Sequence, residues 1–362
     1  MLPTPVALTR RTIASLGAVG LAIGISLAAA QPAAAAVDPG DGHTTTPAQP
    51  YLGNPNTSDW LGDYQVSGQP RWAVTFALAA PDEAEALQAP TAIKTKWATT
   101  SAQDPKVSYL LWRYGDSPDA DEAAALSHLL YSWYSAPQNP GQLDPSNDFR
   151  HIAYDAPFHL AKLPPATQSL VTQFDSDAAQ FQGPWTVELT APSDAQIGTA
   201  STWTLQVRSA GGSAVPSAPV TVTVTDGTVN GATSAPFTTP ADGSPLDLDV
   251  TPTGDSPAVT VDLEAPIDSA VARVPVAVDV QIVVSRADNV TSLSRTVAAV
   301  ATDPATQPGG GGSSDGDDDA ALPQVGSDAP RSTGWLGLLL VVTGSCLVWS
   351  ARPRGAGRHA AR

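Results

Sequence analysis

The second half of the chain alternates apolar and polar residues in short runs, with the two-residue period of strands that bury one face. Turn-forming pairs such as Gly211-Gly212, Asp226-Gly227 and Asp242-Gly243 separate these runs. Short alternating strands punctuated by tight turns are typical of two packed antiparallel sheets. The pattern therefore predicts an all-β sandwich over residues 184–303, with strands at 185–190, 202–207, 220–225, 246–250, 258–263 and 274–280.

The preceding region, residues 51–183, shows no such alternation and is predicted to be an α+β domain. Residues 72–78 are predicted to form a strand, and residues 107–114 are apolar enough for either a helix or a buried strand. Residues 119–134 are predicted to form a helix, because Asp119 or Asp121 can cap a run of alanines and leucines that ends before Pro137.

A cleavable signal peptide is predicted over residues 1–36. The pair Arg10-Arg11 precedes an uncharged apolar run at 13–30, and Ala34 and Ala36 then offer the small residues that a signal peptidase accepts. The arginine pair also resembles a twin-arginine export motif, so Sec export and export after folding stay open as alternatives. Both imply an exported protein. Residues 37–50, which lack periodicity, are predicted to be a flexible lead-in.

The other end of the chain has the features of a surface anchor. A Gly- and Asp-rich linker is predicted over residues 304–321. The last segment, 322–362, contains a mostly apolar run at 334–351, about long enough to span a bilayer, and arginines that would hold its end in the cytoplasm. Between the linker and this run lies the pentapeptide Leu322, Pro323, Gln324, Val325 and Gly326.

This arrangement resembles the LPxTG-type cell-wall sorting signal of Gram-positive bacteria. The resemblance implies that a sortase cuts between Val325 and Gly326 and joins the new carboxyl group to a cell-wall peptide. The family has threonine where this chain has Val325, and an enzyme site built to hold a hydroxyl can reject an analogue that lacks it. The alternative is an uncut anchor held in the membrane by the C-terminal helix. Both place the body of the protein in the cell wall or on the outer face of the plasma membrane.

Charge and cysteine content exclude several function classes. Between residues 38 and 319, 34 acidic residues face 11 Lys and Arg, a net charge of −23. Such a field repels nucleic acid, so no nucleic-acid role is expected. The only cysteine, Cys346, lies in the C-terminal apolar run, so the exported part has no thiol for a disulfide, a thiolate metal site or a nucleophile. No cofactor is expected.

Two segments of the α+β region resemble the thioester domains of Gram-positive surface adhesins: Thr75 to Leu78 on a strand and Leu126 to Tyr131 on a helix. In that family a cysteine and a glutamine at these places form an internal thioester. Here Ala77 and Ser127 occupy the two positions. The resemblance therefore implies a related but degenerate domain without the covalent chemistry.

The predicted sandwich, of immunoglobulin-like form, resembles the spacer modules of bacterial surface proteins. Many such modules in pili carry a Lys–Asn isopeptide bond, but no lysine follows Lys162. The expected fold class is thus mixed: an α+β domain, then an all-β immunoglobulin-like sandwich, between a signal peptide and a C-terminal transmembrane helix.

Candidate catalytic and metal-binding groups are few. His151, Asp155 and His159 have a spacing that could align metal ligands on a helix, but Pro157 interrupts that helix, so a structural role is favoured and no metal is expected. Ser127 and His128 are adjacent on the predicted helix and point about 100° apart, which disfavours a serine hydrolase. The acidic runs at 247–249 and 315–319 are interpreted as solvated acids rather than calcium sites.

The aromatic residues of the α+β domain suggest a binding role. Trp112, Tyr131, Trp133 and Tyr134 could line a groove for a glycan or a protein ligand, although core packing explains the same residues. The sequence therefore predicts a non-enzymatic, surface-anchored binding or adhesin-like protein. The alternatives are a wall-associated hydrolase that uses His151, Asp155 and His159, and a purely structural envelope protein.

Overall fold

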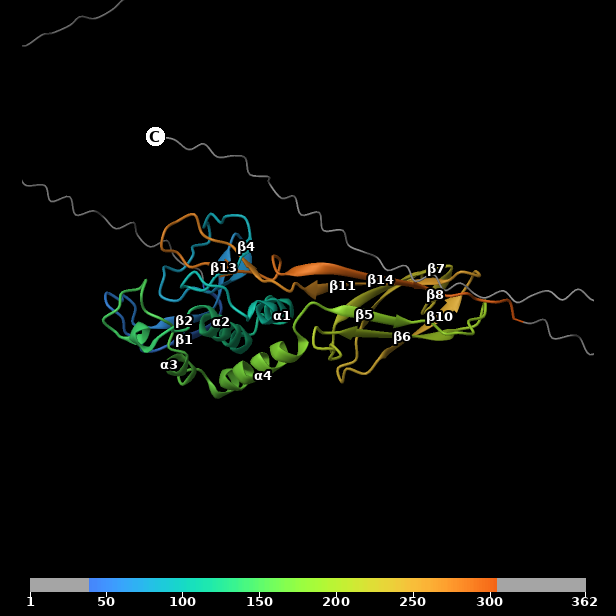
Figure 1. Cartoon of the computed structure of the whole chain (residues 1–362), viewed down its shortest axis with the longest axis horizontal. Coiled ribbons are helices and arrows are strands. Elements are labelled where there is room, and N and C mark those ends of the chain that lie inside the picture. Colours follow the sequence, from blue (N-terminus) through green and yellow to red (C-terminus); the bar gives the residue numbers. More distant parts are fainter. Residues whose placement is uncertain (1–38, 305–362) are drawn as a thin grey trace, which may run out of the picture. The chain divides into compact units, whose positions relative to one another are not determined.

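The computed structural model describes residues 39–304, which belong to one compact unit (Figure 1). β-strands predominate and a few helices accompany them, as the patterns predict. The signal peptide, the sorting pentapeptide Leu322–Gly326 and the apolar run 334–351 lie outside the described residues. Within residues 39–304, no helix is both long enough and apolar enough to cross a membrane.

The first part of the chain builds an antiparallel sheet with the strand order β1-β2-β3-β13. The hairpin between β2 and β3 turns through Ser67 and Gly68, whose φ angles of 56° and 69° are those of a tight two-residue turn. The strands of this sheet are β1 (Pro39–Thr45), β2 (Asp59–Val66), β3 (Gln69–Ala73) and β13 (Val283–Val284).

Strand β1 differs from the flexible lead-in expected for residues 37–50, because it pairs with β2 along its length. Glycines on both strands allow the two backbones to approach closely. A Cβ atom on Gly42 of β1 would lie 2.3 Å from the Leu61 carbonyl oxygen, and one on Gly62 of β2 would lie 2.2 Å from the Asp41 carbonyl oxygen. Glycine in this segment permits strand pairing rather than marking a loop.

Helix α2 (Ala120–Tyr134) packs against β1, β2 and β3 of this sheet. Helix α2 confirms the helix predicted at 119–134: Asp119 caps it by accepting the N–H groups of Asp121 and Glu122 at 2.9 and 3.0 Å. The stretch 107–114, left open between helix and strand, is helical. The helices are α1 (Asp104–Tyr114), α2 (Ala120–Tyr134), α3 (Ala156–Leu160) and α4 (Pro165–Phe181), with a short 3-10 turn η1 at Pro140–Leu143.

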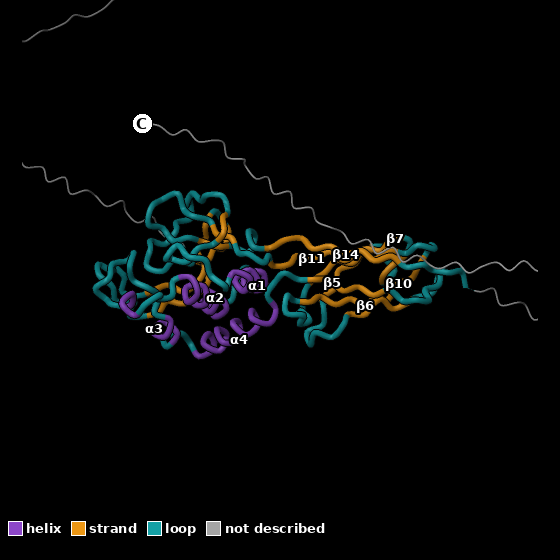
Figure 2. The backbone as a smooth tube through the Cα atoms, in the orientation of Figure 1, coloured by secondary structure: helices purple, strands orange, loops and turns teal. Residues whose placement is uncertain are grey.

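Two four-stranded antiparallel sheets follow, with strand orders β5-β6-β10-β8 and β14-β11-β7-β9. Their strands are the group of orange segments on the right of Figure 2. Their alternate side chains are buried in a shared core that includes Trp203, Leu205, Val222 and Val261. Their strands are β5 (Thr186–Thr190), β6 (Ser201–Arg208), β7 (Pro219–Thr225), β8 (Gly227–Val229), β9 (Ser234–Thr238), β10 (Leu246–Pro252), β11 (Ala258–Pro266) and β14 (Val290–Ala298).

Five of the six strands predicted in this region overlap observed strands, but the run at 274–280 does not. It lies within residues 267–289, which leave the second sheet after β11, reach the N-terminal sheet and return as β14; we call this segment the excursion. Its strand β12 (Val271–Ala272) pairs with β4 (Thr91–Ala92), and its strand β13 pairs with β3 (Figure 1). The excursion therefore completes the N-terminal sheet, so tertiary structure crosses the boundary expected at 183/184.

The strand predicted at 72–78 is also shorter than expected, because the residues at its end form hydrogen bonds with the excursion instead of continuing the strand. Strand β3 stops at Ala73, after which the Val74 N–H donates to the Ile282 carbonyl at 2.9 Å. The Ile282 N–H in turn donates to Thr75 Oγ1 at 2.8 Å. Ala77 then turns away from the strand with a φ of 68°. Two hydrogen bonds of this segment thus join it to Ile282, which lies 207 positions after Thr75 in the chain.

A buried cluster of charges fixes the end of the excursion. Asp288 accepts two hydrogen bonds from Arg273, both of 2.7 Å, and one of 2.8 Å from Ser285. Arg71 on β3 approaches the same carboxylate at 3.4 Å, and the side chains of Arg71 and Asp288 are only 9% and 10% exposed. The cluster therefore joins the excursion to the N-terminal sheet.

Candidate ligand-binding pocket

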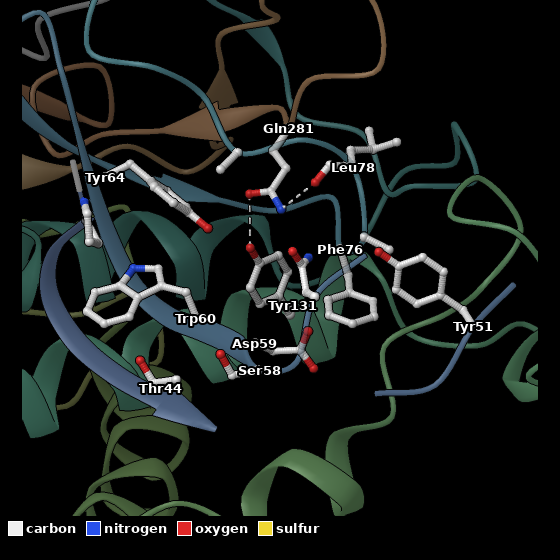
Figure 3. Close-up of a pocket in the computed structure, with 14 residues that line it drawn as sticks. Thr44, Tyr51, Ser58, Asp59, Trp60, Tyr64, Phe76, Leu78, Tyr131 and Gln281 are labelled. Carbon is white, nitrogen blue, oxygen red and sulfur yellow. Dashed lines mark hydrogen bonds between the residues drawn. The ribbon is translucent and has the colours of Figure 1, made fainter. Parts of the chain in front are cut away.

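A cavity in the N-terminal part has a volume of about 340 Å³, is open to solvent and is lined by aromatic and polar side chains (Figure 3). We call it the aromatic pocket. Its walls come from β1, β2, the segment after β3, α2 and the excursion. Five rings line it: Tyr51, Trp60, Tyr64, Phe76 and Tyr131. Five polar side chains join them: Thr44, Asn56, Ser58, Asp59 and Gln281.

The inner wall of the aromatic pocket is held by ring packing and hydrogen bonds. Phe76 packs edge-on against Tyr131, with ring centroids 5.8 Å apart and ring planes at 79°. The Tyr131 hydroxyl donates to Gln281 Oε1 at 3.1 Å, and Gln281 Nε2 donates to the Leu78 carbonyl at 3.1 Å (Figure 3). The excursion therefore supplies the group that holds Tyr131 and the backbone at Leu78 together.

The outer rings have a different character. Tyr51 and Trp60 are half-buried, and in Figure 3 they stand on either side of the pocket with Asp59 and Phe76 between them. Trp60 is oriented by its indole N–H, which donates to the Asp63 carbonyl at 3.1 Å. These two rings keep part of their surface free to contact a ligand.

Among the described residues that line the aromatic pocket, Asp59 alone is charged. It is 8% exposed, and its Oδ2 accepts the Gln49 N–H at 2.6 Å and lies 3.0 Å from Nε2 of His159. Its Oδ1 has no hydrogen-bond partner within residues 39–304. One carboxylate oxygen is thus anchored to the protein, and the other is available to a ligand.

His159 lies behind Asp59 and is fully buried, stacked on Tyr154 with ring centroids 4.3 Å apart. Its Nδ1 is 2.9 Å from the Asp155 carbonyl oxygen, while its Nε2 faces the Asp59 carboxylate. A carbonyl and a carboxylate oxygen can only accept hydrogen bonds, so the ring satisfies both contacts when both nitrogens carry a proton.

The phenols of the aromatic pocket stay neutral at physiological pH. Burial raises the pKa of Tyr64, and the negative charge of Asp59 raises it further. The pKa of Tyr51 is also raised, first by burial and then by Asp59. Both side chains therefore present hydroxyl groups that can donate and accept hydrogen bonds.

Lys96 supports the wall of the aromatic pocket from behind. Its ammonium group donates to three backbone carbonyls, those of Phe76 at 2.6 Å, Phe149 at 2.8 Å and Ile152 at 2.7 Å. Burial lowers the pKa of Lys96 to about 7. Three carbonyls around one amine fix the backbone at Phe76 against the loop before α3.

This lysine predicts a specific pH dependence of stability. Between its folded pKa of about 7 and its ordinary value of 10.5, the unfolded chain binds a proton that the folded chain has lost, so the free energy of unfolding rises with pH. Urea unfolding at pH 7 and pH 9.5 should show a larger gain in the parent than in Lys96→Met, and Lys94→Met, at an exposed site, should behave like the parent. Equal gains in the parent and Lys96→Met would contradict this.

The four aromatic residues singled out in the sequence do not form one groove. Only Tyr131 reaches the aromatic pocket. Trp112 is buried against Trp185, with ring centroids 4.6 Å apart, and Tyr134 is buried with its hydroxyl donating to Asp104 at 2.5 Å. Trp133 is half-buried beneath Lys106, whose Nζ is 5.5 Å from the ring centroid. Core packing explains these three.

The structure also separates His151, Asp155 and His159. His151 is exposed and its Nδ1 lies 2.6 Å from Asp148 Oδ1, whereas His159 is buried against Asp59. Asp155 caps α3 by accepting the Phe158 N–H at 3.1 Å. Within residues 39–304, no three His, Cys, Asp or Glu side chains gather in a way that could hold a metal ion.

The remaining residues singled out in the sequence lie in the cavity wall, in the core or on the surface. Ala77 lines the aromatic pocket, whereas Ser127 is buried and its Oγ has no hydrogen-bond partner in the described part of the chain. His128 Nδ1 lies 2.8 Å from the Tyr154 hydroxyl, and burial lowers the pKa of His128 to about 4. Asp247 and Asp249 are exposed on β10, and residues 315–319 lie outside the described residues.

Sequence analysis did not identify Tyr51, Asp59, Trp60 or Gln281. An acid next to a tryptophan on a strand is a weak signal for Asp59 and Trp60. No sequence signal pointed to Gln281, because its partner Tyr131 lies 150 residues away along the chain. No protein-family model matches this chain, and no curated protein matches its sequence.

Proposed function

We propose that this chain is a non-enzymatic, adhesin-like binding protein, displayed outside the cell with the aromatic pocket as its point of contact with a glycan or protein ligand. The observation that carries the proposal is the pocket itself. Its half-buried rings and the carboxylate oxygen that has no partner in the described residues line a cavity open to solvent. A hydrophobic core would bury such rings completely, and a surface loop would not hold them in place.

The remainder of the chain fits display at a surface. The two packed sheets act as an immunoglobulin-like spacer that carries an α+β domain. The leader at 1–36 directs export, and the tail at 322–362 holds the protein through a sortase-made bond to a cell-wall peptide or through its apolar helix. With an exported charge of −23, anionic partners such as nucleic acid are disfavoured.

A hydrolase using His151, Asp155 and His159 has less support, because these side chains face different surroundings and one of them is exposed at the surface. A purely structural role leaves the open aromatic pocket without a use. A binding role accounts for the open pocket, and it does not require His151, Asp155 and His159 to lie together.

Arrays of glycans and extracellular proteins test this function, with residues 37–304 as the probe. We expect a ligand whose signal falls at least about tenfold in Tyr51→Ala, which removes exposed ring surface. Leu52→Ala is the matched control, because it truncates the exposed neighbour of Tyr51 that does not line the aromatic pocket. Equal retention of every bound ligand in Tyr51→Ala would refute the proposal.

A further inference from the structure

We infer that the aromatic pocket takes one uncharged sugar ring of a glycan, which contacts Tyr51 and Trp60 and donates a hydroxyl hydrogen bond to Asp59. This inference rests on the proposed function and names the chemical class of its ligand. It is carried by the rings, by the hydrogen-bonding groups and by the charge balance of the pocket, each taken in turn below.

The rings suit the apolar face of a sugar. Tyr51 and Trp60 are half-buried, so each leaves ring surface open toward the cavity (Figure 3). Aromatic side chains combine a large apolar surface with a polar edge, and sugar rings combine C–H faces with hydroxyl edges. Phe76 and Tyr131 close the floor behind them. A flat ring that enters the pocket would meet aromatic surface on its faces.

The polar groups suit the hydroxyl edge of a sugar. Asp59 Oδ1 has unused acceptor capacity, while its Oδ2 is held by Gln49 and His159. Asn56 and Ser58 line the same cavity with neutral groups that both donate and accept. A hydroxyl group can donate to the carboxylate and accept from the amide or the serine. Ligands that only donate or only accept would leave part of this set unpaired.

Charge decides between a neutral sugar and a charged ligand. Within residues 39–304, no Lys, Arg or His lines the aromatic pocket, so an acidic sugar or a phosphate would find no cation there to pair with. A cationic ligand is also disfavoured, because Asp59 Oδ2 already faces His159 Nε2 at 3.0 Å, and Lys162 lies close enough to sense the same carboxylate. The carboxylate is thus a hydrogen-bond acceptor rather than an unpaired anion.

The size of the cavity limits the occupant. At about 340 Å³ it is at the lower end of the range of small-molecule sites. It has room for a sugar ring, and the rest of a glycan would extend into solvent through the open side. Affinity for one ring should accordingly be weak, in the range of millimolar dissociation constants.

Titrations of residues 37–304 with single methyl glycosides test the inference. The probes are methyl glucoside, mannoside, galactoside and N-acetylglucosaminide, followed by protein NMR, with glucuronic acid and choline as the charged probes. We expect saturable binding of at least one neutral glycoside and at least about tenfold weaker binding of both charged probes.

Variants locate the binding. Asp59→Asn and Tyr51→Ala should each weaken the neutral glycoside at least about tenfold. Asp262→Asn, which makes the same charge change on an exposed position of β11, should bind like the parent. Because Asp59 also bonds to Gln49 and His159, Tyr51→Ala keeps the test valid if Asp59→Asn is misfolded.

The outcomes separate the two proposals. Tighter binding of glucuronic acid or choline, or neutral binding that is unchanged in Tyr51→Ala, would overturn the inference. A protein ligand that requires Tyr51 while no glycoside binds would also overturn it, yet would leave the proposed function standing. Neutral-sugar binding that is lost in Tyr51→Ala supports both.

Discussion

Replacing the excursion with a short turn is expected to unfold the N-terminal part of the protein while the two packed sheets remain folded. Pro266 and Val290 are paired neighbours on β11 and β14, so a turn of about four residues can close that hairpin. The N-terminal sheet, however, would lose β13. Val283 and Val284 are both fully buried, and their burial alone is worth about 3–6 kcal/mol, which is comparable to the whole stability of many domains.

Hydrogen exchange followed by mass spectrometry measures this result. Amides of α2 and β2 should exchange rapidly in the variant, and those of β6 and β7 should stay protected. Residues 39–183 expressed alone should be unfolded for the same reason. Native-like protection of α2 in either protein would show that the N-terminal part does not need the excursion.

Asp288→Ala is expected to destabilise the protein by about 3–5 kcal/mol, because it leaves the buried guanidinium of Arg71 without its carboxylate. It also removes two hydrogen bonds to Arg273. Chemical unfolding at pH 7 measures the change. Asp262→Ala, at an exposed position whose side chain makes no hydrogen bond within residues 39–304, should change stability by no more than about 0.5 kcal/mol.

The effect of Asp288→Ala should shrink in acid. Burial would raise the pKa of Asp288, but the bonds from Arg273 and Ser285 and the charges of Arg273 and Arg71 outweigh it and lower the pKa. A depressed pKa contributes stability above the ordinary range of aspartate, and that contribution is lost as the pH falls through the folded value. An unfolding difference that is as large at pH 3 as at pH 7 would contradict the ion cluster.

Local signals predicted local structure well. The cap at Asp119 and the stop at Pro137 determine where α2 begins and ends, and both are visible in the sequence. Period-two alternation likewise located β6, β7, β10 and β11, because every second side chain of these strands is buried. The expected fold class was mixed, an α+β domain followed by an all-β sandwich, and its coarser part, a β-rich chain with a few helices, followed from these signals alone.

Long-range pairing could not be predicted in this way. The run at 274–280 alternates like a strand, yet its valines Val276 and Val278 are exposed because the excursion crosses to another sheet there. The aromatic pocket depends on the same crossing, since Gln281 meets Tyr131 across 150 residues. An aromatic residue in sequence shows that it can pack, but only the fold distinguishes Tyr131 in a cavity wall from Tyr134 in a core.

The location of a bound ligand tests the central claim most directly. A crystal structure of residues 37–304 with the strongest ligand from the arrays should show it against Tyr51 and Trp60, within hydrogen-bonding distance of Asp59 Oδ1. A ligand seated instead on the outer face of the β7 and β11 sheet, with the aromatic pocket empty, would contradict the account.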